Sequence, residues 1–314
     1  MKIFVGITDG GWCDFLRDGS YTEVNFWKPS GKPFKAISKG ELFLFKLKAS
    51  RGHMIVGGGF FEEYRLMSVD WAWRAFECEN GAHNLAELCE RIGKYRVNST
   101  LNIVDSQIGC IMLSDVFWLD EKDWFLAPGN WNAIVTGKTF DTDDQGSSDD
   151  CKWLYDQIKA RLSGKELFSE QSPEDLILPI SSGYTIGTAK HRIGQGVFSV
   201  RVADAYHHRC AITGERTMPV LQAAHIKPVS NNGPYSVPNG MLLRSDIHTL
   251  FDWGYITVTD DLRVEVSGRL HDDWKNGKEY YAFHGKKLAV IPDLVALRPA
   301  LEYLDWHHEH VFRG

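Results

Sequence analysis

The sequence predicts an α+β protein of two domains, and three observations lead to this prediction. A length of 314 residues is long for one domain and comfortable for two. The first half contains short apolar runs separated by turn residues, together with a few helical segments. The second half contains a strand, a loop, a second strand and a helix between Cys210 and Gly254. With 43% hydrophobic and 24% charged residues, the composition is that of an ordinary globular protein.

Short strands dominate the first half. They are expected where apolar runs lie between turn residues, at 2–7, 21–27, 41–48, 53–61 and 108–118. Three glycines at 57–59 indicate a bulge or a close backbone approach. Helical periodicity covers 69–76 and 84–95. Residues 9–11 are expected to form a turn and residues 120–131 a loop, so that residues 1–145 make a barrel or curled sheet with small helices.

A helix and a linker are expected between the two halves, over residues 146–190. Ser148 can cap a helix at 149–162, with Trp153, Leu154 and Ile158 on one apolar face. Residues 163–190 contain two prolines and a Ser-Ser-Gly run, which favours an interdomain linker. The second domain then spans residues 191–314 and opens with a helix at 194–207.

The stretch from Cys210 to Gly254 can be divided by its apolar runs. A strand over 220–226 carries His225 at its end and is stopped by Pro228. Residues 230–239 are rich in Asn, Gly, Ser and Pro and form a loop, and residues 241–243 are a second strand. Ser245 can cap a helix over 247–251, and Gly254 stands where a helix ends. A hairpin is expected next, over 255–258 and 262–266.

This arrangement brings together groups that could perform hydrolysis. His248 and Asp252 are four apart on the helix and share one face, where an imidazole and a carboxylate can hold a divalent metal. His225, at a strand end and expected outside the core, could deprotonate a water. Asn239 can tie the loop to its neighbour through bonds from its side chain to the backbone. The alternative is a purely structural unit whose polar residues only satisfy one another.

The order AHIKP, PNG and SDIHTLFD resembles the HNH nuclease motif, a ββα-metal finger. The resemblance implies that His225 is the general base, Asn239 the asparagine that orients the loop, and His248 a metal ligand. Asp252 falls where many members have a second helical ligand. Many HNH nucleases carry Asp or His immediately before the base, whereas this chain has Ala224. Water or another side chain must therefore supply that ligand.

The expected ligand set indicates the metal, and two basic residues are candidates for phosphate contacts. Two protein ligands leave room for waters, so Mg²⁺ is the expected ion, with Mn²⁺ or another transition metal able to substitute. Lys227 and Arg244 are candidate phosphate contacts, although exposed basic residues usually face solvent.

The first module resembles the EVE domain of the PUA-like superfamily, through NFWKPSG, KGELFLFKL, IVGGGFF and IGCIML. The resemblance covers residues 1–145 and implies a β-barrel that binds a single base in an aromatic-lined pocket. An extruded base needs planar side chains to stack on and polar groups to read its edge. Trp12 and Trp27 could provide the stacking, with Asp9, Asn25 and Ser30 as polar candidates. A position in the core is the alternative for each tryptophan.

The whole chain resembles an EVE–HNH modification-dependent restriction endonuclease of the type IV kind. The resemblance implies metal-dependent hydrolysis of foreign double-stranded DNA, such as phage DNA, that carries modified bases. 5-Methylcytosine and 5-hydroxymethylcytosine are the first candidates. Cutting both strands needs two centres, so a homodimer is expected. Two alternatives stay open: a reader of modified nucleic acid with weak catalysis, and a nonspecific or RNA-directed HNH nuclease.

Charge and cysteine content limit the function classes. The net charge is −6, and residues 187–314 carry 15 basic and 14 acidic residues, so DNA contacts must come from local patches. Six scattered cysteines without a CxxC pair suit a reduced cytoplasm. No apolar run reaches membrane-spanning length, and no membrane contact is expected. His307, His308 and His310 look like metal ligands but lack a partner motif, so a helical surface terminus is expected there.

Overall fold

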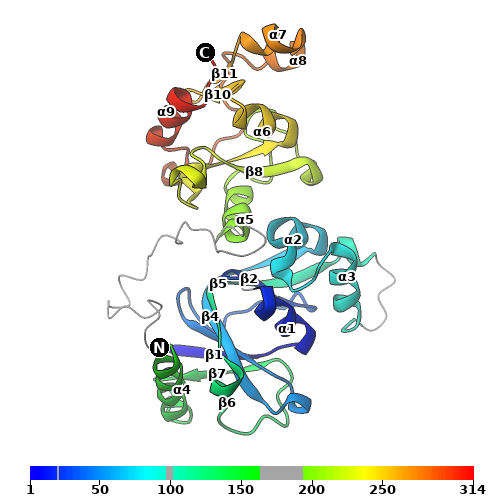
Figure 1. Ribbon diagram of the computed structural model, residues 1–314, viewed down its shortest axis with the longest axis vertical. Helices are drawn as coiled ribbons and strands as arrows, with labels where there is room; N and C mark the ends of the chain where they lie inside the picture. Colours follow the sequence, from blue (N-terminus) through cyan, green and yellow to red (C-terminus); the bar gives the residue numbers. More distant parts are fainter. Residues whose placement is uncertain (20, 97–101, 163–193) are drawn as a thin grey trace. The chain divides into compact units, whose positions relative to one another are not determined.

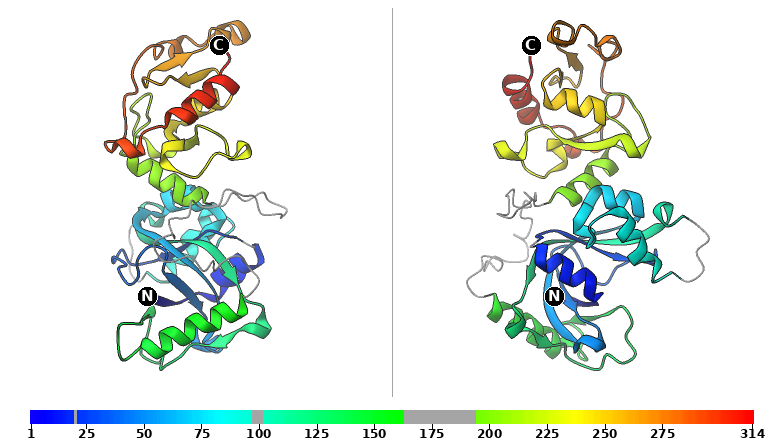
Figure 2. Two further views of the ribbon diagram at one scale, coloured as in Figure 1. Left: turned by 90° about the vertical axis from the view of Figure 1, so that its left-hand side faces the viewer. Right: turned by 45° about the vertical axis from the view of Figure 1, so that its right-hand side comes forward.

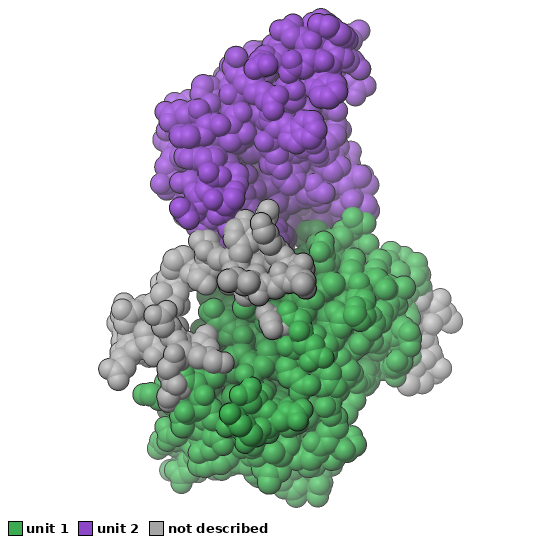
Figure 3. All heavy atoms as spheres, in the orientation of Figure 1, with its two compact units in different colours: residues 1–178, 187–191 green, residues 179–186, 192–314 purple. Residues whose placement is uncertain are grey.

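The structure, a computed structural model, describes residues 1–19, 21–96, 102–162 and 194–314. These residues divide into two compact units, 1–162 and 194–314, and each is described by itself (Figures 1 and 3). The predicted linker over 163–190 lies outside the described residues. Across the described ranges, no helix combines the length and the apolarity needed to cross a membrane.

A mixed sheet of seven strands forms the centre of the N-terminal unit (Figure 1). The strand order is β2-β5-β4-β3-β1-β7, with β6 paired to β4. β1 runs parallel to β3, and the other paired neighbours are antiparallel. The strands are β1 (Lys2–Ile7), β2 (Val24–Lys28), β3 (Leu42–Lys46), β4 (Met54–Ser68), β5 (Gln107–Trp118), β6 (Phe125–Leu126) and β7 (Gly137–Asp141). The five predicted strands are confirmed, whereas β6 and β7 were not predicted.

Glycines allow β4 to lie close to both of its neighbouring strands. A Cβ atom on Gly57 would lie 2.4 Å from the carbonyl oxygen of Phe117, and one on Gly58 would lie 2.7 Å from that of Phe43. The register of β4 against β5 shifts between Gly58 and Phe60. Only glycine allows both neighbouring strands to approach so closely, so the predicted bulge and close approach are both confirmed.

Among the described residues, four α-helices accompany the sheet: α1 (Gly10–Gly19), α2 (Val69–Phe76), α3 (Leu85–Gly93) and α4 (Ser148–Arg161). The expected turn at residues 9–11 is wrong, because Gly10 begins α1. One oxygen of the Asp9 carboxylate accepts bonds from the backbone N–H groups of Gly11 (3.0 Å) and Trp12 (3.4 Å). These bonds satisfy the free donors of the first helical turn and allow a helix to start at two glycines.

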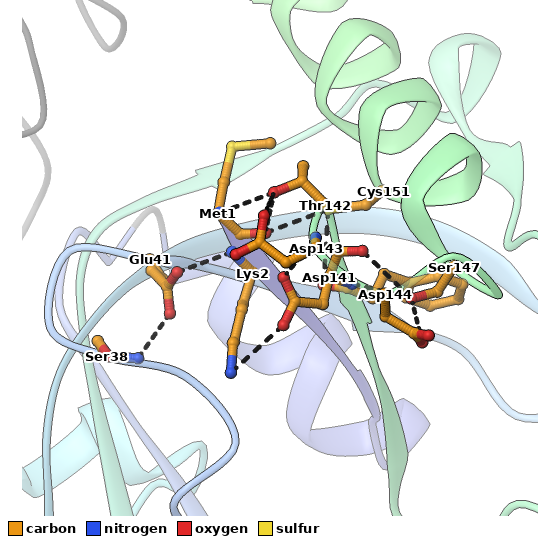
Figure 4. Close-up of polar contacts among 11 residues, drawn as sticks. Met1, Lys2, Ser38, Glu41, Asp141, Thr142, Asp143, Asp144, Ser147 and Cys151 are labelled. Atoms are coloured by element: carbon orange, nitrogen blue, oxygen red, sulfur yellow. Dashed lines mark hydrogen bonds and ion pairs between the residues drawn. The ribbon is translucent and has the colours of Figure 1, made fainter.

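α4 belongs to the N-terminal unit, because its Cys151, Leu154 and Ile158 pack into the core of the sheet. Trp153 is 40% exposed, so its expected place on this apolar face is wrong. Figure 4 shows the polar contacts at the start of the chain beside α4. The Met1 ammonium donates to Thr142 Oγ1 at 2.9 Å, and Lys2 Nζ lies 3.4 Å from Asp141 Oδ2. These contacts fix β1 and β7 next to the helix.

The C-terminal unit contains the predicted strand, loop, strand and helix (Figures 1 and 2). β8 (Leu221–His225) pairs antiparallel with β9 (Gly240–Arg244), and α6 (Ser245–Asp252) follows directly. The predicted hairpin is also confirmed, as β10 (Ile256–Val258) and β11 (Val264–Val266). The remaining helices are α5 (Gln195–Ala205), α7 (Arg269–Trp274), α8 (Lys278–Tyr281) and α9 (Leu301–His310).

His307 on α9 is a core residue, so the expected surface position is wrong. Its side chain is 2% exposed and stacks on Phe251 of α6, with ring centroids 3.7 Å apart. Nε2 donates to the carbonyl oxygen of Phe251 at 3.0 Å, and Nδ1 lies 2.9 Å from Thr257 Oγ1. His307 lies three residues after the buried Leu304, on the same face of α9, and this face fixes the end of α6.

We expect the C-terminal unit to lose about 2 kcal/mol of its free energy of unfolding between pH 7 and pH 5. Burial lowers the pKa of His307 to about 4, so the unfolded histidine binds a proton in this range and the folded one does not. The contribution of neutral His307 to the free energy of unfolding is complete above pH 6.5, and it is lost as the pH falls toward 4. Hydrogen exchange of the β10 amides should show this loss in the wild type and not in His307→Gln. An equal pH dependence in both proteins would contradict the assignment.

Candidate functional site

A buried asparagine fixes the loop that follows His225. Asn239 is fully buried, and its Oδ1 accepts from the backbone N–H of Lys227 at 2.8 Å. Its Nδ2 donates to the carbonyl oxygens of Lys227 (3.0 Å) and Pro234 (2.9 Å). The backbone N–H of Ile226 donates to the carbonyl oxygen of Asn239 at 2.9 Å. The chain immediately after His225 is therefore held to the start of β9.

The His225 ring lies between two aromatic side chains. It stacks on Phe198 of α5, with centroids 4.0 Å apart and planes at 12°, and it meets the edge of Tyr235 at 5.1 Å. Its exposure is only 9%, so the expectation that it lies outside the core is wrong. Phe198 lies 27 positions upstream in a separate helix, and no local pattern indicates this stacking. The two rings restrict the plane of the imidazole.

His248 and Asp252 face each other on α6. His248 Nε2 lies 3.4 Å from Asp252 Oδ2, and the two side chains are 21% and 53% exposed. On the other side of the ring, Nδ1 lies 2.9 Å from Gln222 Oε1. An amide oxygen can only accept, so Nδ1 is the donor in this contact, and in the neutral ring Nε2 then presents its lone pair to the carboxylate. Burial lowers the pKa of His248 against the opposing effect of Asp252, which favours the neutral ring.

This pair of side chains fits a divalent metal ion. Two acceptor atoms that face each other are unfavourable unless a proton or a metal ion lies between them, and a divalent ion can bind both atoms at once. Donor atoms about 2.1 Å from one ion are at most about 4.2 Å apart, and the observed 3.4 Å lies within that limit. Among the described residues, no group of three or more His, Cys, Asp or Glu could hold a metal. Ala224 is fully buried and offers no donor, so waters would complete the coordination.

The two candidate phosphate contacts differ in their surroundings. Arg244 donates to both oxygens of Asp246, at 2.7 Å each, and Asp246 also accepts from the hydroxyl of Tyr280. This ion pair holds the guanidinium against the first turn of α6. Lys227 lies two residues after His225, the last residue of β8, and places its Nζ 5.6 Å from the Trp306 ring. Lys227 thus lies close to His225 in the chain, whereas the Arg244 guanidinium is paired with Asp246.

The N-terminal unit contains a cavity of about 680 Å³ whose walls include several aromatic side chains. Asp9, Trp12, Trp27 and Ser30 line it, whereas Asn25 does not. The Asn25 amide is buried and donates to Asn80 Oδ1 at 2.8 Å and to Cys110 Sγ at 3.3 Å. Asn25 therefore belongs to the internal packing behind the cavity.

The two tryptophans are both core residues and cavity walls. Trp12 meets the rings of Phe26 and Phe45 edge to face, at 5.3 Å and 5.4 Å. The Trp27 indole N–H donates to the carbonyl oxygen of Asn80 at 3.0 Å. Both side chains are buried, and both also line the cavity. A place in the core and a place in the cavity wall therefore both describe part of their environment.

A polar cluster on the cavity wall was not predicted from the sequence. The Tyr95 hydroxyl donates to Asp9 Oδ2 at 2.7 Å, and Lys48 Nζ lies 2.9 Å from that hydroxyl and 3.3 Å from Asp9 Oδ2. Burial raises the pKa of Asp9, but the hydrogen bonds from Tyr95 and Lys48 outweigh this effect. The pKa therefore lies below its usual value, and the carboxylate is ionised. Lys48 and Tyr95 lie far from Asp9 in sequence and in no motif, so only the fold reveals them.

Residues 210–259 match the HNH endonuclease family. No curated protein sequence is significantly similar to the chain. Among solved structures, one described as a modification dependent TagI restriction endonuclease aligns over 99% of this chain and 81% of its own. The identity is 13% and the TM-score 0.31, which is too low to indicate a shared fold. The C-terminal unit thus contains an HNH endonuclease domain, whose chemistry is hydrolysis of DNA phosphodiester bonds.

We expect His248→Ala and Asp252→Ala each to weaken Mn²⁺ binding at least tenfold, because each removes one of the two donors that face each other. Isothermal titration calorimetry with the full chain measures this affinity. His308→Ala, which changes a half-exposed histidine of α9, should bind Mn²⁺ like the wild type. Removing the metal with EDTA should leave the protein folded, because α6 is held by protein contacts. Unfolding in EDTA would instead show a structural ion.

Proposed function

We propose that this protein is a metal-dependent endonuclease that cuts double-stranded DNA carrying a modified base. In this proposal the HNH domain performs the hydrolysis, and the N-terminal unit binds the modified base. One observation carries the catalytic half: His225, at the end of β8, stacks on Phe198 of α5, and the helix of the same ββα unit presents a facing imidazole and carboxylate. These are the residues to which the HNH resemblance assigns the base and the metal ligands.

The chain's own residues account for most of the proposed mechanism. His225 takes a proton from the attacking water, and its aromatic neighbours prevent the ring from turning away. Asn239 holds the loop and thereby the position of Lys227, which contacts the phosphate. His248 and Asp252 would hold the divalent ion, Mg²⁺ or Mn²⁺, which when bound stabilises charge on the phosphate and the leaving oxygen. Cutting both strands requires two such centres, and a homodimer would supply them.

The N-terminal cavity supports the second half of the proposal, an EVE-type base reader. Its aromatic walls can stack an extruded base, and the Asp9–Tyr95–Lys48 cluster offers an acceptor and donors to the base edge. Stacking and these bonds would offset the few kcal/mol that base flipping costs. An added methyl group in an apolar niche contributes about 1 kcal/mol, so discrimination among cytosine modifications is expected to be incomplete.

A reader with weak catalysis is the second candidate function. The buried Ala224 supplies no ligand, so α6 alone provides the protein donors. In addition, the residues before Gly187 include 20 basic and 27 acidic residues, a net charge of −7, whereas the residues from Gly187 onward carry a net charge of +1. Binding without cleavage in the presence of Mg²⁺ or Mn²⁺ would establish this function instead. An RNA-directed nuclease would cut RNA in preference to DNA under the same conditions.

His225→Ala should lower the cleavage rate about 10²–10⁴-fold, the usual contribution of a general base. The loss of its stacking on Phe198 should also lower the free energy of unfolding, by about 2 kcal/mol. Tyr235→Leu is the matched control, because it loosens the same packing but keeps the imidazole. Single-turnover cleavage and urea unfolding of both variants separate chemistry from stability. A His225→Ala rate above one tenth of the wild-type rate would exclude His225 as the base.

Cleavage should depend on the modified base and on the cavity. One plasmid, unmodified or carrying 5-methylcytosine or 5-hydroxymethylcytosine, should be cut only in its modified forms at fixed salt. Asp9→Asn and Tyr95→Ala should reduce this cleavage at least tenfold without changing Mn²⁺ affinity. Leu126→Ala, at an exposed position that does not line the cavity, should have no effect. Equal cutting of modified and unmodified plasmid would leave a nonspecific HNH nuclease.

A further inference from the structure

The strand that carries His225 also contacts His248 through a residue that no motif singles out. Side chains two apart on a strand project from the same face, so Gln222 and Ala224 share one face of β8. The methyl group of Ala224 is buried and carries no polar atom. The longer Gln222 side chain places Oε1 2.9 Å from His248 Nδ1. This face of β8 therefore offers no metal ligand at Ala224, but it supplies a hydrogen-bond acceptor at Gln222.

A neutral imidazole has two tautomers, and the surroundings of His248 distinguish them. With the proton on Nδ1, the ring donates to Gln222 and keeps the Nε2 lone pair available. With the proton on Nε2, the ring would turn its donor toward Asp252 Oδ2, which lies 3.4 Å away. In this second form, His248 Nε2 and Asp252 Oδ2 would be hydrogen-bonded to each other, and neither lone pair would be available to a metal ion. The acceptor at Gln222 therefore decides whether the pair is open to an ion.

We propose that Gln222 is a positioning residue of the metal site, which holds the proton of His248 on Nδ1 and presents Nε2 to the ion. This inference rests on the proposed metal-dependent function. Outer-shell acceptors of this kind fix the orientation of a histidine ligand, and their removal typically lowers metal affinity about 10–100-fold. Gln222 acts through His248 and contacts neither water nor phosphate in the proposed reaction.

Three variants test the assignment. Gln222→Leu keeps the approximate size of the side chain and removes the acceptor, whereas Gln222→Glu restores an acceptor oxygen. Thr249→Val is the matched control, because it changes the neighbour of His248 on α6, whose hydroxyl bonds only within the helix, to Ser245. Two readouts are needed: the ¹⁵N shifts of the His248 ring in metal-free full-length protein, and Mn²⁺ affinity by calorimetry.

The wild type, Gln222→Glu and Thr249→Val should show the Nδ1–H tautomer and bind Mn²⁺ with similar affinity. Gln222→Leu should move the proton toward Nε2 and weaken Mn²⁺ binding about 10–100-fold. An Nε2–H tautomer in the wild type, or unchanged tautomer and affinity in Gln222→Leu, overturns the role of Gln222 alone. A wild type that binds no Mn²⁺ overturns the proposed metal site, and the role of Gln222 with it.

Discussion

The three hydrogen bonds of the Asn239 amide are the constraint on which the nuclease centre depends. The loop between β8 and β9 has no strand partner, so its backbone groups must bond elsewhere if they are buried. One side chain satisfies an N–H and two carbonyl groups at once. Gly233 makes this possible, because a Cβ atom there would lie 1.8 Å from the Lys227 carbonyl oxygen. The loop therefore closes tightly, and the strand end at His225 has a fixed position.

The second half of the centre depends on a helix that is fixed at both ends. At its start, Arg244 and Asp246 form a bidentate ion pair, and the hydroxyl of Tyr280 on α8 also donates to Asp246. At its end, His307 of α9 donates to the carbonyl oxygen of Phe251 and stacks on its ring. A helix of eight residues has little stability of its own. Because these contacts hold α6, His248 and Asp252 keep the facing arrangement that suits an ion.

Local sequence patterns predicted what depends on neighbours in the chain. The ββα unit, the β10–β11 hairpin and the helices at 69–76 and 84–95 follow from apolar periodicity and capping residues, and they are confirmed. The errors arise where partners come from distant segments. His307 and Trp153 were assigned without knowledge of the surfaces they meet, and Asp9 caps a helix where two glycines indicated a turn. Gln222, Lys48 and Tyr95 gain their significance only from contacts across the fold.

The charge of the protein bears on how its two proposed activities would combine. A nonspecific DNA-binding protein usually carries a basic surface, because phosphate contacts and counterion release supply most of its affinity. Here the net charge is −6, and the Arg244 guanidinium is neutralised by Asp246. Long-range attraction to DNA is therefore weak, so a nuclease of this kind would depend on another contact to remain on its substrate. A base held in the aromatic cavity would supply that contact without increasing affinity for unmodified DNA. In the proposed function, the low basic charge thus restricts cleavage to DNA that the N-terminal unit can bind.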